Sequence, residues 1–326
     1  MFEINFEIRK NATFATMKNP QLLRRRLVQG MTLAGVLSAL GISLPVFAQD
    51  GLVTQKLTDR ITLVSGAGSN VVLFTGRDGI TVVDSGSAPM ASELAGTIKD
   101  LAGATPVTTL FNTHWHEDHT GGNEALRDLG ARIIAHENTR LWLSAEFEVE
   151  WRNTSHSPRR KAALPDMTFY GSGEKDLGGE TVQYFHYEQA HTDGDIALFF
   201  PDSNVLVAGG LMSDGTYPIT DIATGGWIGG LIQANEAMLA IANDATIIVP
   251  ENGPARTKAD LQAQYDMLTD LYETMKSLVQ DGFTGRNMLD KGITSKYDAT
   301  WGDPTEFLLE TYRGMTAHTS DMGGFI

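Results

Sequence analysis

Cysteine is absent from all 326 residues of the chain. Disulfides and thiolate metal ligands are therefore both excluded, and any metal would have to be held by histidine and carboxylate side chains. That ligand set fits zinc and also tolerates iron or manganese.

Positive charge is also scarce. The chain has 25 Lys and Arg residues against 40 Asp and Glu residues, which gives a formal net charge of −15 at pH 7. Such an acidic balance argues against nucleic acid and anionic membrane surfaces as partners. We therefore expect a small-molecule substrate and no nucleic acid, and the sequence leaves the oligomeric state open.

Long apolar runs are missing too, because the apolar run at residues 31–40 is too short to span a membrane comfortably. Three arginines at 24–26 precede it, and a small-residue cleavage pattern ends at Ala48. This arrangement resembles a twin-arginine export signal, with an ordinary secretory signal or an uncleaved anchor as the alternatives. We expect residues 1–48 to be an export signal and residues 49–326 to be a periplasmic domain without a stable membrane anchor.

Histidine, by contrast, is concentrated in one place. Residues 114–119 read His-Trp-His-Glu-Asp-His, so three imidazoles and a carboxylate pair fall within six positions. Neutral imidazole is the commonest metal ligand among side chains. Three nitrogen ligands with a fourth position left open are the usual arrangement of a catalytic zinc.

The sequence around this cluster predicts its place in the fold. Residues 107–112 are mostly β-branched or aromatic and predict a buried strand, and a helix is expected around 124–126. The cluster would then lie on a loop at the carboxyl edge of a sheet, where α/β folds place their chemistry. His191 lies on a second loop between two strand-like segments, and we expect it to be the third ligand beside His114 and His116.

The rest of the chain alternates between strand and helix patterns. Two strand–helix halves in succession predict an α/β protein, an αββα sandwich with the metal at one edge of the paired sheets. Residues 255–326 are expected to form a helical C-terminal portion. The least regular segment, residues 137–180, is either a binding loop or a solvated excursion. The predicted strands are 61–64, 71–75, 80–83, 182–187, 196–200 and 204–208, and the predicted helices are 90–101, 231–241 and 261–279.

In this order the motifs resemble those of the metallo-β-lactamase-fold hydrolases, from about Gly51 to Thr311. Residues 80–86 resemble the family's strand ending in Asp and Gly, and residues 114–119 match its histidine signature. Residues 190–195 resemble the motif of its third histidine. The resemblance implies a sandwich of the metallo-β-lactamase type and metal-dependent hydrolysis. It leaves the substrate open, because one fold hosts many chemistries.

Two positions depart from the family pattern. Gly210 stands where members with two metals carry an Asp or Cys, and Asn252 stands where they carry a last histidine. Both departures affect the second metal position and spare the first. We therefore expect one Zn²⁺ per chain and a doubtful second site, unless Asp214 or Glu251 replaces the missing ligands.

The resemblance also implies roles for individual residues. Zinc lowers the pKa of its water, so metal-bound hydroxide would attack an acyl substrate such as a lactam, lactone, ester or thioester. Asp118 would orient the water and accept its proton, and His119 would bind the substrate or donate a proton to the leaving group. Asp84 would accept a hydrogen bond from a ligand imidazole. Trp227, flanked by paired glycines, is expected to contact the substrate, with core packing as the alternative.

Two other functions remain open at this point. One is an iron-dependent sulfur-compound dioxygenase of the same fold, although those relatives rely on an Asp where Gly210 stands. The other is a catalytically silent metal-binding relative.

Overall fold

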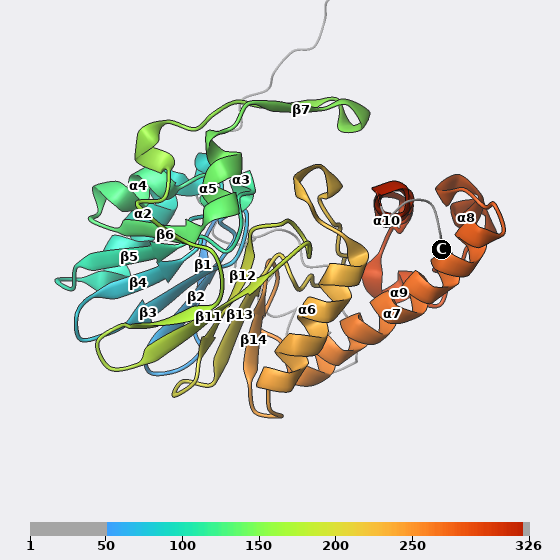
Figure 1. Ribbon diagram of the computed structural model, residues 1–326. Coiled ribbons are helices and arrows are strands. Elements are labelled where there is room, and N and C mark those ends of the chain that lie inside the picture. The colour runs from blue at the N-terminus through green and yellow to red at the C-terminus, as the bar shows by residue number, and fades with distance from the viewer. Residues whose placement is uncertain (1–50, 322–326) are drawn as a thin grey trace, which may run out of the picture. The chain divides into compact units, whose positions relative to one another are not determined.

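Two β-sheets lie face to face in the computed structural model of the protein, which describes residues 51–321 (Figure 1). All of these residues belong to one compact unit. The predicted export signal, residues 1–48, lies outside the described residues, so its boundary with the following domain stays a prediction.

The first sheet has seven strands in the order β1-β2-β3-β4-β5-β6-β9. The strands from β1 to β4 pair antiparallel, whereas β4, β5, β6 and β9 pair parallel. Parallel pairing brings the carboxyl ends of β4 and β5 to the same edge, where polar residues follow both strands. The strands are β1 (Val53–Lys56), β2 (Ile61–Ser65), β3 (Val71–Thr75), β4 (Ile80–Val83), β5 (Val107–Phe111), β6 (Arg132–His136) and β9 (Met167–Phe169).

The second sheet has five strands in sequence order from β10 to β14. Only β13 and β14 pair parallel, and the other neighbours pair antiparallel. The turn between β11 and β12 therefore lies at one edge of this sheet. The strands are β10 (Gly173–Asp176), β11 (Thr181–Tyr187), β12 (Asp195–Phe200), β13 (Val205–Gly209) and β14 (Ile247–Pro250).

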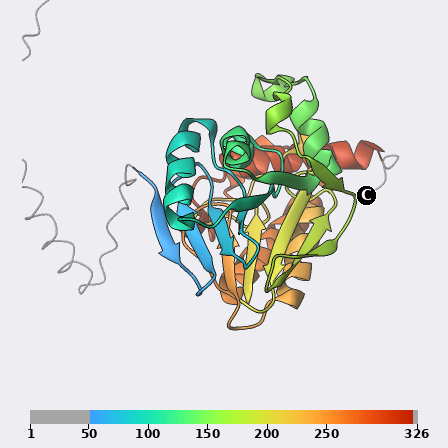
Figure 2. The same cartoon turned by 90° about the vertical axis from the view of Figure 1, so that its left-hand side faces the viewer.

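Helices cover the outer faces of both sheets. In Figure 2 the strands of the two sheets run through the middle, with the orange C-terminal helices behind them. Within residues 51–321 no helix combines the length and apolar character needed to cross a membrane. The helices are α2 (Ala91–Ala102), α3 (Glu117–Thr120), α4 (Asn123–Asp128), α5 (Glu137–Ser144), α6 (Ile228–Ile241), α7 (Lys258–Gln280), α8 (Gly285–Lys291), α9 (Asp298–Trp301) and α10 (Thr305–Asp321).

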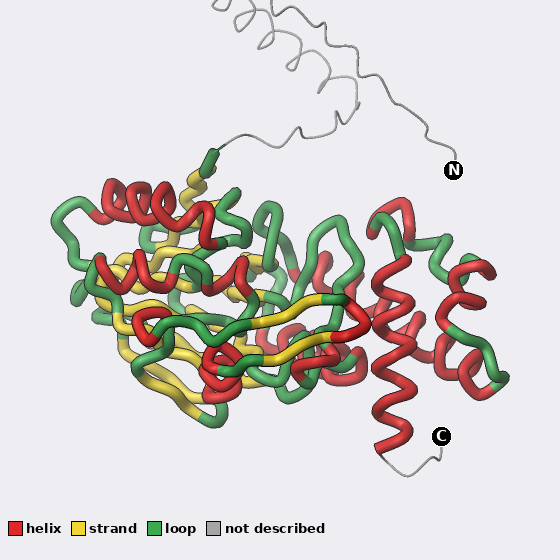
Figure 3. The backbone as a smooth tube through the Cα atoms, turned by 90° about the horizontal axis from the view of Figure 1, so that it is seen from above, coloured by secondary structure: helices red, strands yellow, loops and turns green. Residues whose placement is uncertain are grey.

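A two-stranded hairpin projects from the segment between β6 and β9. It consists of β7 (Phe147–Val149) and β8 (Thr154–His156), which pair antiparallel. Figure 3 shows its two strands running from the sheet region to helix α10. The segment predicted to be irregular therefore contains a short hairpin and α5.

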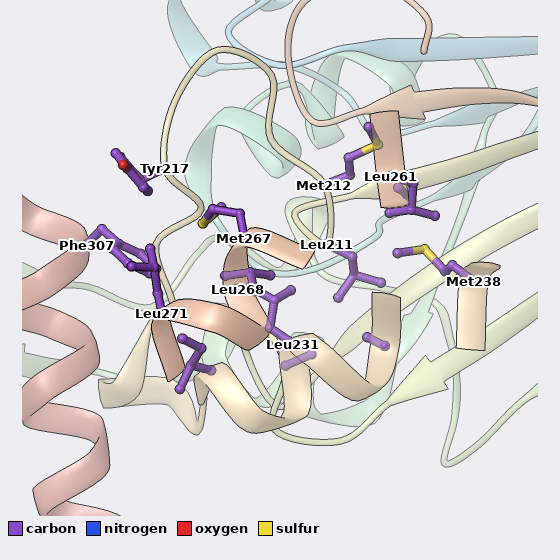
Figure 4. Packing of buried hydrophobic residues seen from close by; sticks show 14 of the residues in the cluster. Leu211, Met212, Tyr217, Leu231, Met238, Leu261, Met267, Leu268, Leu271 and Phe307 are labelled. Atoms are coloured by element: carbon purple, nitrogen blue, oxygen red, sulfur yellow. The ribbon is translucent and has the colours of Figure 1, made fainter. Parts of the chain in front are cut away.

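Three buried apolar layers establish the order of the sandwich. Phe74 and Phe200 stack at 5.4 Å between their ring centroids within the layer that separates the two sheets. Leu94 of α2 and Leu126 of α4 belong to the layer outside the first sheet. The layer outside the second sheet contains Leu231 and Met238 of α6 with Leu268 and Leu271 of α7 (Figure 4). The predicted αββα sandwich is confirmed.

Helix α6 begins three residues earlier than the sequence pattern predicted, at Ile228. Its first turn contains Gly229 and Gly230, which usually weaken a helix. Close packing explains these glycines, because a Cβ at Gly230 would lie 2.0 Å from the carbonyl oxygen of Gln189. The helix can therefore approach the loop that leads into His191.

Candidate metal centre

Three histidines from the two sheets converge at one edge of the sandwich. His114 and His116 follow β5 of the first sheet, and His191 lies between β11 and β12 of the second. One ring nitrogen from each lies within 4.8 Å of the others. The Nδ1 atom of His116 is 3.1 Å from Nε2 of His114 and 3.0 Å from Nε2 of His191.

In two of the rings, the nitrogen that faces away from the other imidazoles is hydrogen-bonded, and this bond determines the tautomer. The Nδ1 atom of His191 donates to the carbonyl oxygen of Ile219 at 2.6 Å. The Nε2 atom of His116 donates to Oδ2 of Asp221 at 3.1 Å. Each ring thus has its N–H on the outside and a bare lone pair on the nitrogen that faces the other rings.

The third ring is held through a hydroxyl group. Thr113 Oγ1 donates to Asp84 Oδ2 at 2.8 Å, so its oxygen is available as an acceptor for His114 Nδ1 at 3.1 Å. This arrangement leaves the Nε2 atom of His114 bare as well.

Three lone pairs therefore face one another with no donor between them. A proton does not fill this role at neutral pH, because burial and then the neighbouring imidazoles lower the pKa values of two of the rings. The pKa of His114 lies well below its usual value, and that of His191 is lowered to about 3. A cation satisfies all three nitrogens, so the residues present fit a metal ion with an imidazole ligand set.

Asp221 is a site residue that the sequence reasoning missed. Burial raises the pKa of its carboxyl group, but the hydrogen bond from His116 and the electrostatic effect of the neighbouring imidazoles outweigh burial and lower it to about 2. The Thr224 hydroxyl donates to the same oxygen at 2.7 Å, and Trp115 Nε1 donates to Thr224 Oγ1 at 3.0 Å. This chain fixes the orientation of the His116 ring. Asp221 is separated from His116 by 105 residues and follows an irregular stretch, so no spacing pattern pointed to it.

Asp84 organises the same edge from β4. Its backbone is left-handed, with φ 63°, and its Oδ1 accepts a hydrogen bond from Thr113 N at 2.7 Å. Its Oδ2 is 2.7 Å from His119 Nδ1. Asp84 thus holds His119 directly, whereas it reaches the ligand His114 only through the Thr113 hydroxyl. The predicted contact with a ligand imidazole is therefore an indirect one.

His119 and Asp118 lie beside the three ligands. His119 is 1% exposed, and its Nε2 atom has no hydrogen-bond partner among the described residues. Burial lowers the pKa of His119, but the carboxylates of Asp84, Asp118 and Glu251 outweigh it and raise the pKa to about 9. Its Nε2 is 3.7 Å from Oδ2 of Asp118, whose side chain is 44% exposed. The site therefore holds one charged imidazole next to a carboxylate that solvent reaches.

A side chain at Gly210 would meet the ring of His191. A Cβ there would lie 2.5 Å from Cδ2 of His191, so the imidazole fills the space in which an Asp or Cys side chain would begin. Asn252 is exposed at the surface.

The two suggested replacement ligands have other partners. Asp214 pairs with Arg256. Glu251 accepts a hydrogen bond from Ser213 Oγ at 2.9 Å, and burial raises the pKa of its carboxyl group. Among the side chains that the structure describes, residues 51–317, the three histidines form the only group of at least three potential ligands that lie this close together.

Trp227 lies at the start of α6. Its indole covers Gly229, where a Cβ would lie 2.1 Å from the ring, and packs against Tyr272 of α7 with centroids 6.2 Å apart. Its backbone N–H donates to the carbonyl oxygen of Ala190 at 2.9 Å. These are packing contacts of the outer helical layer. The substrate contact expected of Trp227 is not tested by them and stays a prediction.

Comparisons with known proteins agree with this geometry. The family model of the metallo-beta-lactamase superfamily matches residues 64–251, which include all three histidines. The chain is similar to a metallo-beta-lactamase from Pontibacter korlensis, with 21% identity and a TM-score of 0.55 over 67% of this chain and 99% of that one. It is also similar to the DIM-1 metallo-beta-lactamase, with 20% identity and a TM-score of 0.53 over 67% and 97% of the two chains. At these identities the two structures show a shared fold.

Proposed function

Because this chain belongs to the metallo-β-lactamase superfamily, we propose that it is a zinc-dependent hydrolase of an acyl substrate: a lactam, lactone, ester or thioester. One observation carries the proposal. Three imidazoles from two distant loops, of which His114 is fully buried and the others partly or largely so, direct bare nitrogens at one another, and three such ligands with a fourth position open are typical of a catalytic zinc.

In the proposed hydrolysis, the residues around the metal would have different roles. His114, His116 and His191 would hold the zinc, which when bound would lower the pKa of a water and polarise a carbonyl oxygen. The Asp118 side chain is 44% exposed beside the ligands, so its carboxylate would accept a proton from water there. His119 is charged at neutral pH and donates a hydrogen bond from Nδ1 to Asp84. Its Nε2–H group stabilises the negative charge of the Asp118 carboxylate. It would also stabilise a substrate oxygen on which negative charge develops during the reaction.

Elemental analysis combined with an activity panel tests this proposal. The purified protein should hold about one zinc per chain. It should hydrolyse at least one member of a panel of chromogenic esters, thioesters, lactones and β-lactams. Activity should disappear with a chelator, return with zinc, and be absent from His116→Ala, with circular dichroism used to check that the variant folds.

Two results would contradict the proposal in different ways. Iron after aerobic purification, together with oxygen uptake on a sulfur compound, would replace the hydrolase with a dioxygenase. No turnover that depends on His116 across the panel would leave a silent metal-binding protein.

A further inference from the structure

A pocket of about 280 Å³ adjoins the candidate metal centre. Trp115 forms part of its wall, and this residue stands between two of the three ligands in the sequence. The indole packs against His116 with ring centroids 4.6 Å apart. The pocket and the metal centre therefore share one side chain as a common wall.

The aromatic walls of the pocket are held by the scaffold. Trp115 Nε1 donates to Thr224 Oγ1, and Trp142 Nε1 donates to Asp193 Oδ1 at 2.7 Å. Phe147 packs against both indoles, with centroids 5.5 and 5.2 Å away. Since both indole N–H groups are already bonded elsewhere, the indoles present ring surface to a ligand.

The ring of a histidine extends this aromatic surface. His156 stacks on Phe147 at 4.5 Å and packs edge-on against Trp115 at 4.9 Å. Burial lowers the pKa of this imidazole. A planar group could therefore lie against the rings of Trp115, Trp142 and His156, which all line the pocket.

One end of the pocket is charged and polar. Arg159 and Glu117 both line this end; the Arg159 side chain is 33% exposed, and its Nη2 pairs with Glu117 Oε1 at 3.7 Å. That separation exceeds a hydrogen bond, so the guanidinium keeps donors for a ligand. Ser155 and Ser157 add exposed hydroxyl groups to the lining. The polar end suits a carboxylate, which an arginine can bind through two parallel hydrogen bonds.

We propose that this pocket binds an aromatic carboxylate portion of the substrate, with the ring against Trp115 and Trp142 and the carboxylate at Arg159. The volume is near the lower end of small-molecule sites, which suits one ring system with its substituent. The link to catalysis rests on the proposed function, whereas the binding itself does not.

Direct binding of 2-naphthoate to the zinc-loaded full chain tests the proposal by isothermal titration calorimetry. Wild-type protein should bind 2-naphthoate at least about tenfold more tightly than neutral 2-naphthamide or cyclohexanecarboxylate. Arg159→Gln and Trp142→Leu should each weaken 2-naphthoate binding by about tenfold or more. Trp142→Phe, which keeps an aromatic ring, should retain most of the affinity.

Two variants outside the pocket serve as matched controls. Arg160→Gln removes the neighbouring guanidinium, whose side chain is 84% exposed, and Tyr170→Leu removes an aromatic ring that is 80% exposed. Both should bind 2-naphthoate as the wild type does.

Equal binding by wild type, Arg159→Gln and Trp142→Leu would overturn the proposal, because the carboxylate would then be held by the metal alone. Binding that depends on Arg159 in a protein without hydrolytic activity would sink only the proposed function. Suppose instead that the protein hydrolyses only aliphatic substrates and that neither Arg159→Gln nor Trp142→Leu changes 2-naphthoate binding. That result would overturn the proposal for the pocket and leave the proposed function standing.

Discussion

The carboxylate of Asp221 orients the proposed metal ligand His116 and is not one of the three proposed ligands. Its hydrogen bond to Nε2 of His116 fixes both the tautomer and the direction of the ring. Asp221→Asn keeps the shape of the side chain and removes its negative charge. We expect zinc affinity to fall by about 10- to 100-fold.

Competition with a chromogenic chelator measures this loss. The matched control is Asp202→Asn, which changes an exposed carboxylate on the turn after β12 and should leave zinc affinity unchanged. Wild-type affinity in a folded Asp221→Asn protein would show that the ring is held by packing alone.

Gly210→Asp tests how little space there is beside His191. A Cβ at this position meets the His191 ring at 2.5 Å, so Gly210→Asp displaces a ligand before it can supply one. We expect elemental analysis of Gly210→Asp to find at most about one zinc per chain, with lowered affinity. Gly96→Ala, in α2 with nothing within 4 Å of its Cβ, should bind zinc normally. Two zinc ions in Gly210→Asp would mean that the His191 ring moves aside readily.

His136 makes stability depend on pH in the acidic range. It is 3% exposed and stacks on His186 at 3.6 Å. Burial and then the charge of His186 lower its pKa to about 4, and the carboxylates of Glu137 and Glu188 only partly oppose this. The stabilising contribution is complete above pH 6.5, where the unfolded ring is neutral, and is lost as pH falls toward 4, because only the unfolded ring takes up a proton.

Urea unfolding of the metal-free protein at pH 7 and pH 5 checks this effect. The free energy of unfolding of the wild type should fall by about 2 kcal/mol more than that of His136→Phe between these pH values. All other titrating groups are the same in the two proteins, so His136→Phe provides the baseline for their contribution. Parallel losses in the two proteins would contradict the assignment to His136.

The sequence revealed some of the site residues and concealed others for identifiable reasons. His114, His116 and His191 could be found because each adjoins a strand pattern, and two of them belong to one dense motif. Asp221 could not be found, since its role arises only when its loop folds beside β5. The steric role of Gly210 was equally hidden, because it depends on where the His191 ring comes to lie.

The hairpin of β7 and β8 has little support from the core, because most of its side chains are exposed or only partly buried. Its tip contacts α10, where Trp151 Nε1 donates to Glu310 Oε2 at 3.3 Å and Arg313 lies 5.0 Å over the Trp151 ring. Arg152 adds ion pairs to Glu306 and Glu310 at 3.5 and 3.6 Å. Surface pairs of this kind each contribute less than about 1 kcal/mol.

Trp151→Ala should therefore loosen the hairpin without unfolding the protein. We expect faster amide hydrogen exchange at residues 147–156 and a change of at most about 1 kcal/mol in the global free energy of unfolding. Hydrogen exchange read by mass spectrometry gives the first quantity, and urea unfolding gives the second. Tyr170→Ala is the control for loss of an exposed aromatic ring. Unchanged exchange in the hairpin would mean that α10 does not hold it.

The sequence predicted the central elements better than this hairpin. Strands β2 to β5 and β11 to β13 are mostly β-branched or apolar runs and were predicted. Strands β1, β6, β9, β10 and β14 were not predicted, and β10, with the sequence Gly-Glu-Lys-Asp, has no apolar run at all. Each strand of the hairpin has only three residues, so the alternation of Phe147, Glu148 and Val149 in β7 is too short to identify a strand from the sequence. Its pairing depends on the surface it crosses, which no local pattern encodes.

For the whole molecule, the main expectation concerns metal and stability. A metal that binds only the folded chain stabilises it by about 2.7 kcal/mol when free metal exceeds the dissociation constant 100-fold. Chelation should lower the melting temperature of the wild type and leave that of His116→Ala unchanged. Differential scanning calorimetry with and without zinc measures both. A melting temperature that ignores zinc would mean that the folded chain does not bind it.

The ligands come from both sheets: His114 and His116 follow a strand of one, and His191 follows a strand of the other. A bound ion is therefore a cross-link between the two halves of the sandwich. Any slippage of one sheet over the other, such as one caused by a smaller side chain at Phe74 or Phe200, would stretch that cross-link. The dissociation rate of the bound metal would then measure how strongly the two sheets pack against each other.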